Sequence, residues 1–176
     1  MTKPNFDLTR SIELLERTPK VLFALLSGLD TFWIGSASDP RDWEAFDIVG
    51  HLIHAERTDW VPRARIIIEQ GPDRNFTPFD RLAQFEASKG RDLAGLLTEF
   101  SALRSESLKT LNEWELSHKD LEMLGIHPEF GEVTLRQLIA TWVVHDLTHL
   151  RQINIKMARK YSDDVGPWRE YLSILQ

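Results

Sequence analysis

The sequence predicts an all-α protein, a single-domain four-helix bundle that spans residues 1–176. Apolar residues recur at spacings of three and four, which places them on one face of a helix. No segment alternates polar and apolar residues over a length that a sheet would need. Four long helical patterns are separated by segments rich in turn residues. Packing four amphipathic helices around one core is the most economical arrangement for a chain of this length.

The first helix is predicted from about Leu8 to Leu29. Its expected core positions recur at helical spacing: Ile12, Leu15, Val21, Leu22, Leu25 and Leu26. Pro19 lies inside this pattern and should divide or kink the helix, because proline lacks the backbone N–H of a helix interior. The turn residues of "GSASDPRDWE", residues 35–44, predict a loop after this helix.

The second helix is predicted from about Trp43 to Gln70, with Asp42 as its N-cap and a kink at Pro62. A loop at residues 71–80 leads to a third helical region from about Arg81 to Ser117. Gly90 marks an expected interruption of that region.

The fourth helix is predicted to begin close to Thr134 and to continue to about Tyr161. Threonine is a favoured N-cap residue. The preceding segment, "GIHPEFGEV" at 125–133, contains the Gly and Pro residues of a turn. The final "VGPWREYLSIL" is expected to form a short helix or a packed tail.

Composition excludes several classes of function. The chain has a net charge of -6 and no cluster of Lys or Arg, which argues against nucleic acid as a partner. No run is long and apolar enough for a membrane span, and the N-terminal segment carries scattered charges, so we expect no signal peptide and a cytoplasmic location. Cysteine is absent, so a metal would be bound by His, Asp or Glu.

Two histidines interrupt the apolar stripe of the fourth helix. The stripe comprises Leu135, Leu138, Trp142, His145, His149, Gln152 and Lys156. His145 and His149 are four residues apart, so they project from one side with Cβ atoms about 6 Å apart. Two imidazoles at this spacing can converge on one ion, as the paired histidines of HExxH sites do. The alternative is a pair of hydrogen-bonded core histidines or a solvent-facing pair.

A third histidine lies on the second helix. His51 shares a stripe with apolar residues, and the small Gly50 and Ala55 leave space beside it. Asp47, one turn earlier, is expected to orient the His51 ring or to act as a general base. His54 is the reserve ligand, because it is three residues from His51. For His118 and His127, at a helix end and in a turn, we expect surface or capping roles.

Other polar residues near these histidines have weaker claims. Glu56 and Asp59 are possible bases, but charged residues on a long helix are usually solvated. Asp146 is expected to be a structural partner of Arg151 or of another helix. Three arginines are candidates for binding an anionic substrate: Arg63, Arg65 and Arg81. Three tryptophans are candidates for the border of a cavity: Trp33, Trp60 and Trp142.

The combined motifs resemble the DinB/YfiT-like superfamily of metalloenzymes. The resemblance covers nearly the whole chain and includes "DIVGHLIHAE" and "HPEFGEVTLRQLIATWVVHDLTHLRQI". It implies an up-down-down-up four-helix bundle that is usually dimeric. It also implies one divalent metal ion, held by His51, His145 and His149. Nickel and zinc are the metals expected first, with iron and manganese as alternatives. His54 is a departure, since it makes this segment richer in histidine than the family's pattern requires.

Three histidines with open coordination positions would form a catalytic metal site, which makes water or a thiol nucleophilic at neutral pH. The leading hypothesis is therefore a metal-dependent hydrolase, or a transferase that uses a low-mass thiol such as bacillithiol or mycothiol, acting on a small electrophile. The alternative is a non-catalytic bundle that binds metal, or none, and acts through its surface as a homodimer.

Overall fold

The computed structural model describes residues 6–35 and 42–176. Its α-helices are α1 (Leu8–Leu15), α2 (Thr18–Leu26), α3 (Thr31–Ile34), α4 (Ala45–Thr58), α5 (Trp60–Gln70), α6 (Ala83–Ser88), α7 (Leu93–Glu113) and α8 (Leu135–Arg159). Two short strands follow α7, β1 (Leu124–His127) and β2 (Gly131–Thr134). Short 3-10 helices are η1 (Gly71–Asp73), η2 (Asp120–Glu122), η3 (Gly166–Tyr171) and η4 (Ser173–Leu175).

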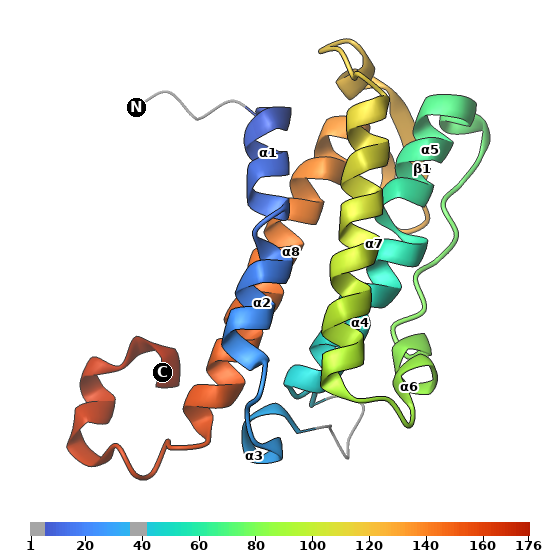
Figure 1. Ribbon diagram of the computed structural model, residues 1–176. Coiled ribbons are helices and arrows are strands. Elements are labelled where there is room, and N and C mark those ends of the chain that lie inside the picture. The colour runs from blue at the N-terminus through green and yellow to red at the C-terminus, as the bar shows by residue number, and fades with distance from the viewer. Residues whose placement is uncertain (1–5, 36–41) are drawn as a thin grey trace.

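Four rods of helix form the bundle. The first is α1 with α2, the second is α4 with α5, and the third and fourth are α7 and α8. In Figure 1 the first rod descends, the second and third ascend, and the fourth descends again. Relative directions therefore follow the up-down-down-up order that the resemblance implied, and the predicted helical bundle is confirmed.

Breaks divide the first two rods. Pro19 lies in the first turn of α2, where a backbone N–H would make no helical hydrogen bond, so its absence costs nothing. The helix is interrupted just before it by a turn at residues 16 and 17. In the second rod the break falls at Asp59, three residues before the predicted kink. Pro62 consequently lies in the first turn of α5, the position in a helix that tolerates proline.

Capping residues fix where the two site-bearing helices begin. The N-cap of α4 is Glu44 and not the predicted Asp42, because Glu44 and Asp47 form a reciprocal capping box. Thr134 caps α8 as predicted. Its side chain accepts from Gln137 N at 3.1 Å, and Gln137 Oε1 accepts from Thr134 N at 2.8 Å. These caps set the register in which the histidines of both helices face each other.

The segment expected to be a simple turn is an antiparallel β-hairpin. Its register pairs Leu124 with Thr134 and His127 with Gly131. Each strand has only four residues, which is too short for a period-two pattern to be recognised in the sequence. Gly125 lets the hairpin pack directly on the core, because a Cβ there would lie 2.6 Å from Ile67 Cγ1.

The core consists of two apolar clusters with buried polar residues between them. On α8, Trp142 belongs to one cluster and Ile153 to the other. On α7, Leu108 belongs to the cluster of Trp142 and Phe100 to the cluster of Ile153, and the buried Arg104 lies between them. His145 and His149 lie within the corresponding interval of α8, so the candidate site occupies the middle of the bundle.

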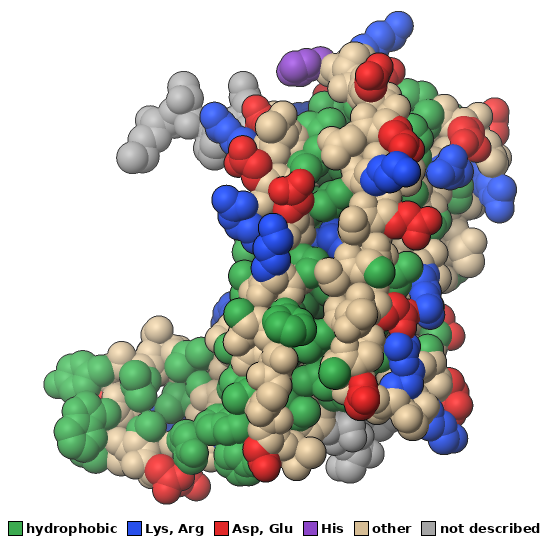
Figure 2. Space-filling view, viewed as in Figure 1, with side chains coloured by type: hydrophobic (Ala, Val, Ile, Leu, Met, Phe, Trp, Pro, Cys, Tyr) green, Lys and Arg blue, Asp and Glu red, His purple; other side chains and the backbone are tan. Residues whose placement is uncertain are grey.

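The C-terminal residues form an arm that extends away from the bundle (Figure 1). Figure 2 shows apolar side chains gathered on this arm. Trp168 is 69% exposed and Tyr171 is 84% exposed, whereas Leu175 is buried. Among the residues that the structure describes, no helix has both the length and the apolar character of a membrane span.

Candidate metal centre

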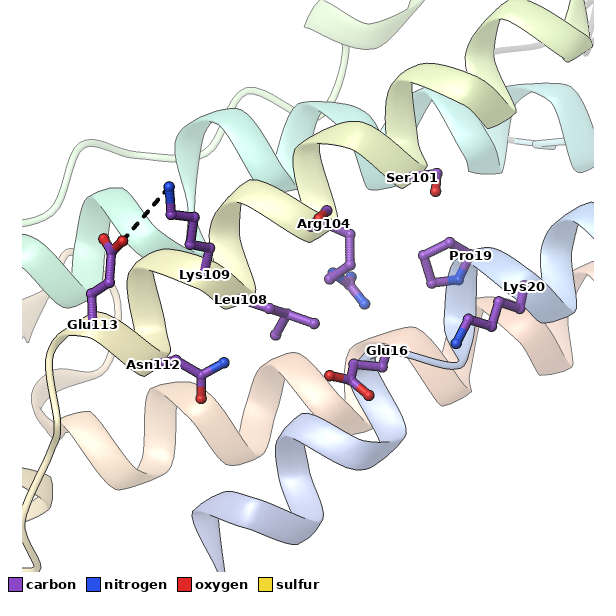
Figure 3. A pocket seen from close by; sticks show the side chains of 10 residues that line it. Glu16, Pro19, Lys20, Ser101, Arg104, Leu108, Lys109, Asn112 and Glu113 are labelled. Atoms are coloured by element: carbon purple, nitrogen blue, oxygen red, sulfur yellow. Dashed lines mark ion pairs between the residues drawn. The ribbon is translucent and has the colours of Figure 1, made fainter.

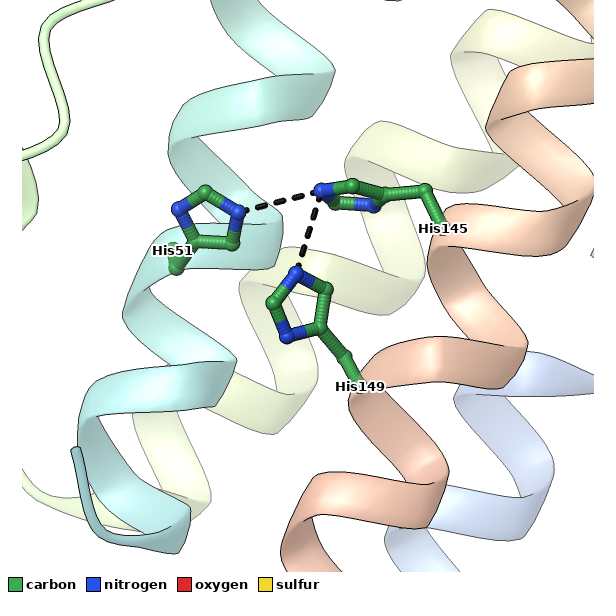
Figure 4. Close-up of side chains that lie close together, drawn as sticks. All are labelled: His51, His145 and His149. Carbon is green, nitrogen blue, oxygen red and sulfur yellow. Dashed lines mark hydrogen bonds between the residues drawn. The ribbon is translucent and has the colours of Figure 1, made fainter. Parts of the chain in front are cut away.

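Three histidine side chains converge between α4 and α8 (Figure 4). His51 Nε2 and His145 Nε2 are 3.1 Å apart, and His149 Nε2 is also 3.1 Å from His145 Nε2. All three ligand atoms lie within 4.8 Å of one another. His51 and His149 are buried, and His145 is partly buried. Within residues 6–35 and 42–176, this is the only group of three or more His, Asp or Glu side chains close enough to share an ion.

Two of the three nitrogen–nitrogen distances, both 3.1 Å, fit a shared divalent cation. Two nitrogens that are each about 2.0–2.1 Å from one ion lie about 2.9–3.4 Å apart at octahedral to tetrahedral angles. Hydrogen bonds alone cannot satisfy the group, because each neutral imidazole nitrogen offers either one proton or one in-plane lone pair. His145 Nε2 faces two other Nε2 atoms and can pair with only one of them. The donor set therefore suits a cation better than it suits a hydrogen-bonded cluster.

Two glutamines orient the His51 and His149 rings through contacts at their Nδ1 atoms. His51 Nδ1 lies 3.2 Å from Gln84 Oε1, and His149 Nδ1 lies 3.0 Å from Gln152 Oε1. A carbonyl oxygen can only accept, so each Nδ1 carries its proton and each Nε2 keeps a free lone pair. This is the tautomer that a metal requires from both histidines.

Burial keeps the three imidazoles neutral. Desolvation lowers the pKa of His51 to about 3 and that of His145 to about 2, and their histidine neighbours add repulsion against a further charge. Desolvation also lowers the pKa of His149, opposed by the hydrogen bond to Gln152. Only neutral imidazole can ligate a cation, so the surroundings prepare the rings for ligation at neutral pH.

The three histidines open onto a cavity of about 490 Å³. Aromatic side chains form much of its wall: Trp43, Trp60, Phe76, Phe79 and Phe130. Charged side chains line it as well: Asp59, Arg63, Arg81 and Glu129. A volume of this size can hold a small organic molecule in contact with an ion at the histidines.

The structure places Asp47 away from this cavity. Its carboxylate accepts from Glu44 N at 3.0 Å in the α4 capping box, and Gln84 takes the predicted position at His51 Nδ1. Asp59 is the carboxylate from this part of the chain that lines the cavity. Burial raises the pKa of Asp59 to about 6, against the opposing charge of Arg63.

The remaining histidines lie outside the cluster. The ring of His54 packs against Phe79, with centroids 4.8 Å apart, and among the described residues His54 belongs to no group that could hold a metal. His118 is exposed, as expected. For His127 a surface or capping role was expected; in addition, its ring stacks on Phe130 and lines the cavity. His127 Nδ1 also accepts from Glu129 N at 3.1 Å, which shapes the hairpin turn.

A buried ion network lies behind the histidines. Arg104 donates to Glu56 Oε1 at 2.8 and 3.0 Å and to the two oxygens of Asp146 at 2.6 and 3.0 Å. Trp142 Nε1 donates to the same Glu56 oxygen at 3.1 Å. Asp146 therefore has a partner on another helix, as predicted, whereas the expectation that Glu56 is solvated was wrong. The network anchors α8 between its two cavity-facing histidines.

Some of the arginines and tryptophans that the sequence predicted at a cavity line it, and others lie elsewhere. Arg63 and Arg81 line the cavity, whereas Arg65 pairs with Glu69 on the surface. Trp60 lines the cavity and stacks on Trp142, and their ring planes differ by 9°. Trp33 instead packs against Tyr161, at a centroid distance of 5.0 Å. Gln84 and Trp43 carried no recognisable pattern in the sequence, since each is a single residue outside the histidine-bearing stripes.

A larger cavity of about 670 Å³ lies between the α1–α2 rod and α7 (Figure 3). Glu16 and Lys20 are on one side of it, and Lys109 pairs with Glu113 on the other. None of the three converging histidines lines it. We therefore assign the candidate site to the smaller cavity, where the metal-ligating groups are.

Comparisons with known proteins agree with this fold and identify the family. The chain is similar in structure to YfiT from Bacillus subtilis, described as a probable metal-dependent hydrolase with an unusual four-helix bundle topology, with a TM-score of 0.73 and 21% identity. The match covers 89% of this chain and 92% of that chain. No curated protein matched the sequence. The sequence profile of the DinB superfamily matches residues 14–153, a segment that contains all three converging histidines. The chain therefore belongs to the DinB superfamily.

Proposed function

We propose that this protein is a metal-dependent hydrolase of small organic substrates, with His51, His145 and His149 as the metal ligands. The observation that carries the proposal is the convergence of three neutral Nε2 atoms on the wall of a 490 Å³ cavity. A structural metal site is closed by protein ligands, whereas a catalytic site retains open positions. When bound, a divalent ion in such a site supplies Lewis acidity and makes water or a thiol nucleophilic at neutral pH.

The protein's own residues have three tasks in this proposal. Gln84 and Gln152 keep the His51 and His149 rings in the ligating tautomer. The aromatic wall excludes bulk water from a bound substrate. Asp59 is the proposed proton acceptor, because it lines the cavity and its pKa of about 6 suits proton exchange near neutral pH. Asp47 as the base stays a prediction from the sequence.

Hydrolysis of activated aryl esters tests the proposal. The protein is stripped of metal, reloaded separately with nickel, zinc, iron and manganese, and assayed at equal concentration. We expect ester hydrolysis only after reloading with at least one metal, and loss of at least about 100-fold in His145→Ala. His54→Ala is the matched control and should keep its activity. Equal rates in stripped protein, reloaded protein and His145→Ala would overturn the proposal.

The same assay separates the finer alternatives. Adding low-mass thiols tests transfer to a thiol, because a transferase moves the acyl group of the ester to the thiol and forms a thioester in place of the free acid, with the same phenol released. Asp59→Asn and Asp47→Asn compare the two carboxylates, and we expect the larger loss of turnover in Asp59→Asn. A metal-loaded protein that turns over no electrophile in either mode supports the non-catalytic alternative. Light scattering tests the expected homodimer independently of any activity.

A further inference from the structure

Two buried hydrogen-bond donors on α5 have no partner within the described chain. Trp60 and Arg63 are 4% and 7% exposed, yet Trp60 Nε1 and Arg63 Nε make no hydrogen bond. Buried polar groups in folded proteins are almost always paired, so two orphaned N–H groups in one place need an explanation. Both residues line the cavity that contains the three histidines.

The two residues that carry these donors are close in sequence on α5 and lie beside the candidate metal centre. Trp60 and Arg63 are three residues apart, which puts their side chains on one face of α5. The Trp60 ring is in edge contact with the His145 ring, at a centroid distance of 5.0 Å. An N–H group cannot ligate a cation, so these donors face something other than the metal. They suit an oxygen acceptor bound in the same cavity.

The guanidinium of Arg63 is held in place by its other contacts. Its Nη2 donates to Thr77 O at 3.1 Å and pairs with Asp59 Oδ1 at 2.9 Å. The Cζ atom of Arg63 lies over the Phe76 ring, 5.3 Å from its centroid. Both polar contacts are made through Nη2, and Nε has no hydrogen-bond partner among the described residues. A donor fixed in this way binds an acceptor with little loss of side-chain entropy.

We propose that Trp60 Nε1 and Arg63 Nε form a subsite for the carboxylate of the substrate, whose apolar body occupies the aromatic part of the cavity. A carboxylate has two oxygens, one for each donor, and a charge that strengthens the bond to guanidinium. Arg81 supplies a second positive charge on the cavity wall. Asp59 is the cavity carboxylate that pairs with Arg63, so the substrate carboxylate competes with it for this cation. The subsite deepens the proposed function, on which the identity of the molecule as a substrate rests.

Indole N–H resonances in a ¹H–¹⁵N spectrum report directly on this subsite. The Trp60 resonance is assigned by its absence in Trp60→Phe. Phenylacetate is the probe, and phenylacetamide is its neutral counterpart of nearly the same shape. We expect phenylacetate to shift the Trp60 resonance in a saturable way and to bind at least about tenfold more tightly than the amide.

Matched variants test the role of each charge. Arg63→Gln should weaken phenylacetate binding by about tenfold or more, whereas Arg65→Gln, exposed on the same helix, should not change it. Asp59→Asn should tighten binding, because it removes the competing negative charge and keeps the shape. Equal affinity for acid and amide, an unmoved Trp60 resonance, or an unchanged affinity in Arg63→Gln would each overturn the proposal.

Repeating the titration in metal-free His145→Ala distinguishes this subsite from the metal. The Trp60 shift should persist there, because the two donors belong to the protein and not to the ion. If the Trp60 shift persists but the metal-loaded wild type hydrolyses no ester, the subsite is supported and the proposed hydrolase function is not. Loss of all phenylacetate binding on metal removal would show that the carboxylate ligates the ion, and it would overturn the subsite alone.

Discussion

Replacing Arg104 with methionine should destabilise the protein strongly. Arg104 is 1% exposed and makes four hydrogen bonds to two carboxylates that are almost inaccessible to solvent. It also donates to Leu15 O at 2.9 Å. Methionine fills much of the volume but leaves Glu56 and Asp146 as two buried negative charges without a counterion. Breaking a buried ion pair from one side costs about 3–5 kcal/mol. For a chain of this size, that corresponds to a fall of roughly 6–20 °C in Tm.

Urea and thermal unfolding measure this loss, in EDTA so that metal binding does not contribute. Arg136→Met is the matched control, because Arg136 pairs with Glu122 on the surface and its loss should cost less than about 1 kcal/mol. The triple variant Glu56→Gln, Arg104→Met, Asp146→Asn removes all three charges and should recover part of the stability. A loss below about 1 kcal/mol in Arg104→Met, or a triple variant less stable than Arg104→Met, would refute the reasoning.

Three further predictions concern single groups. Burial raises the pKa of Asp59 to about 6 in the folded state. The folded state therefore binds the Asp59 proton more tightly than the unfolded state does, and the stability that the protonated carboxyl contributes at low pH is lost as the pH rises through about 6. Asp59→Asn should therefore be more stable than the wild type at pH 8, by up to about 3 kcal/mol, and the difference should vanish near pH 4 in urea unfolding; a pH-independent difference would contradict this. Gly125→Ala should cost about 1–3 kcal/mol in the same assay, because its Cβ would meet Ile67 and Phe76; a neutral effect would show that the hairpin can move. Thr134→Ala should cost about 1 kcal/mol through loss of the α8 cap, and Thr134→Ser should cost much less.

Patterned features were predictable from the sequence. The fourth helix was recognisable because a capping threonine is followed by a long apolar stripe, and the structure begins α8 directly after Thr134. The histidine pair lies on that stripe, so the helical repeat alone placed both rings on the buried side. Pro19 likewise marked the division of the first rod, since proline is tolerated only in the first turn of a helix.

Features that depend on tertiary contact were not predictable. Gln84 meets His51 from 33 residues away and has no periodicity of its own. Glu56 resembles any charged residue on a helix until Arg104 from α7 lies against it. Asp47 has the spacing of a ring-orienting residue, but its carboxylate serves the α4 cap because the chain turns at Glu44 and not at Asp42. For Gln84 and Glu56 the partner across the bundle decides the role, whereas for Asp47 the local cap of α4 decides it.

Metal content is the most direct test of the central claim, that His51, His145 and His149 share one divalent ion. Elemental analysis of tag-free protein, followed by calorimetric titration of the EDTA-treated protein, gives the stoichiometry and the affinity. We predict one ion per chain in the wild type and in His54→Ala, and loss of that ion in His51→Ala, His145→Ala and His149→Ala. Absence of stoichiometric binding in the wild type, or loss in His54→Ala with retention in His51→Ala, would contradict the assignment.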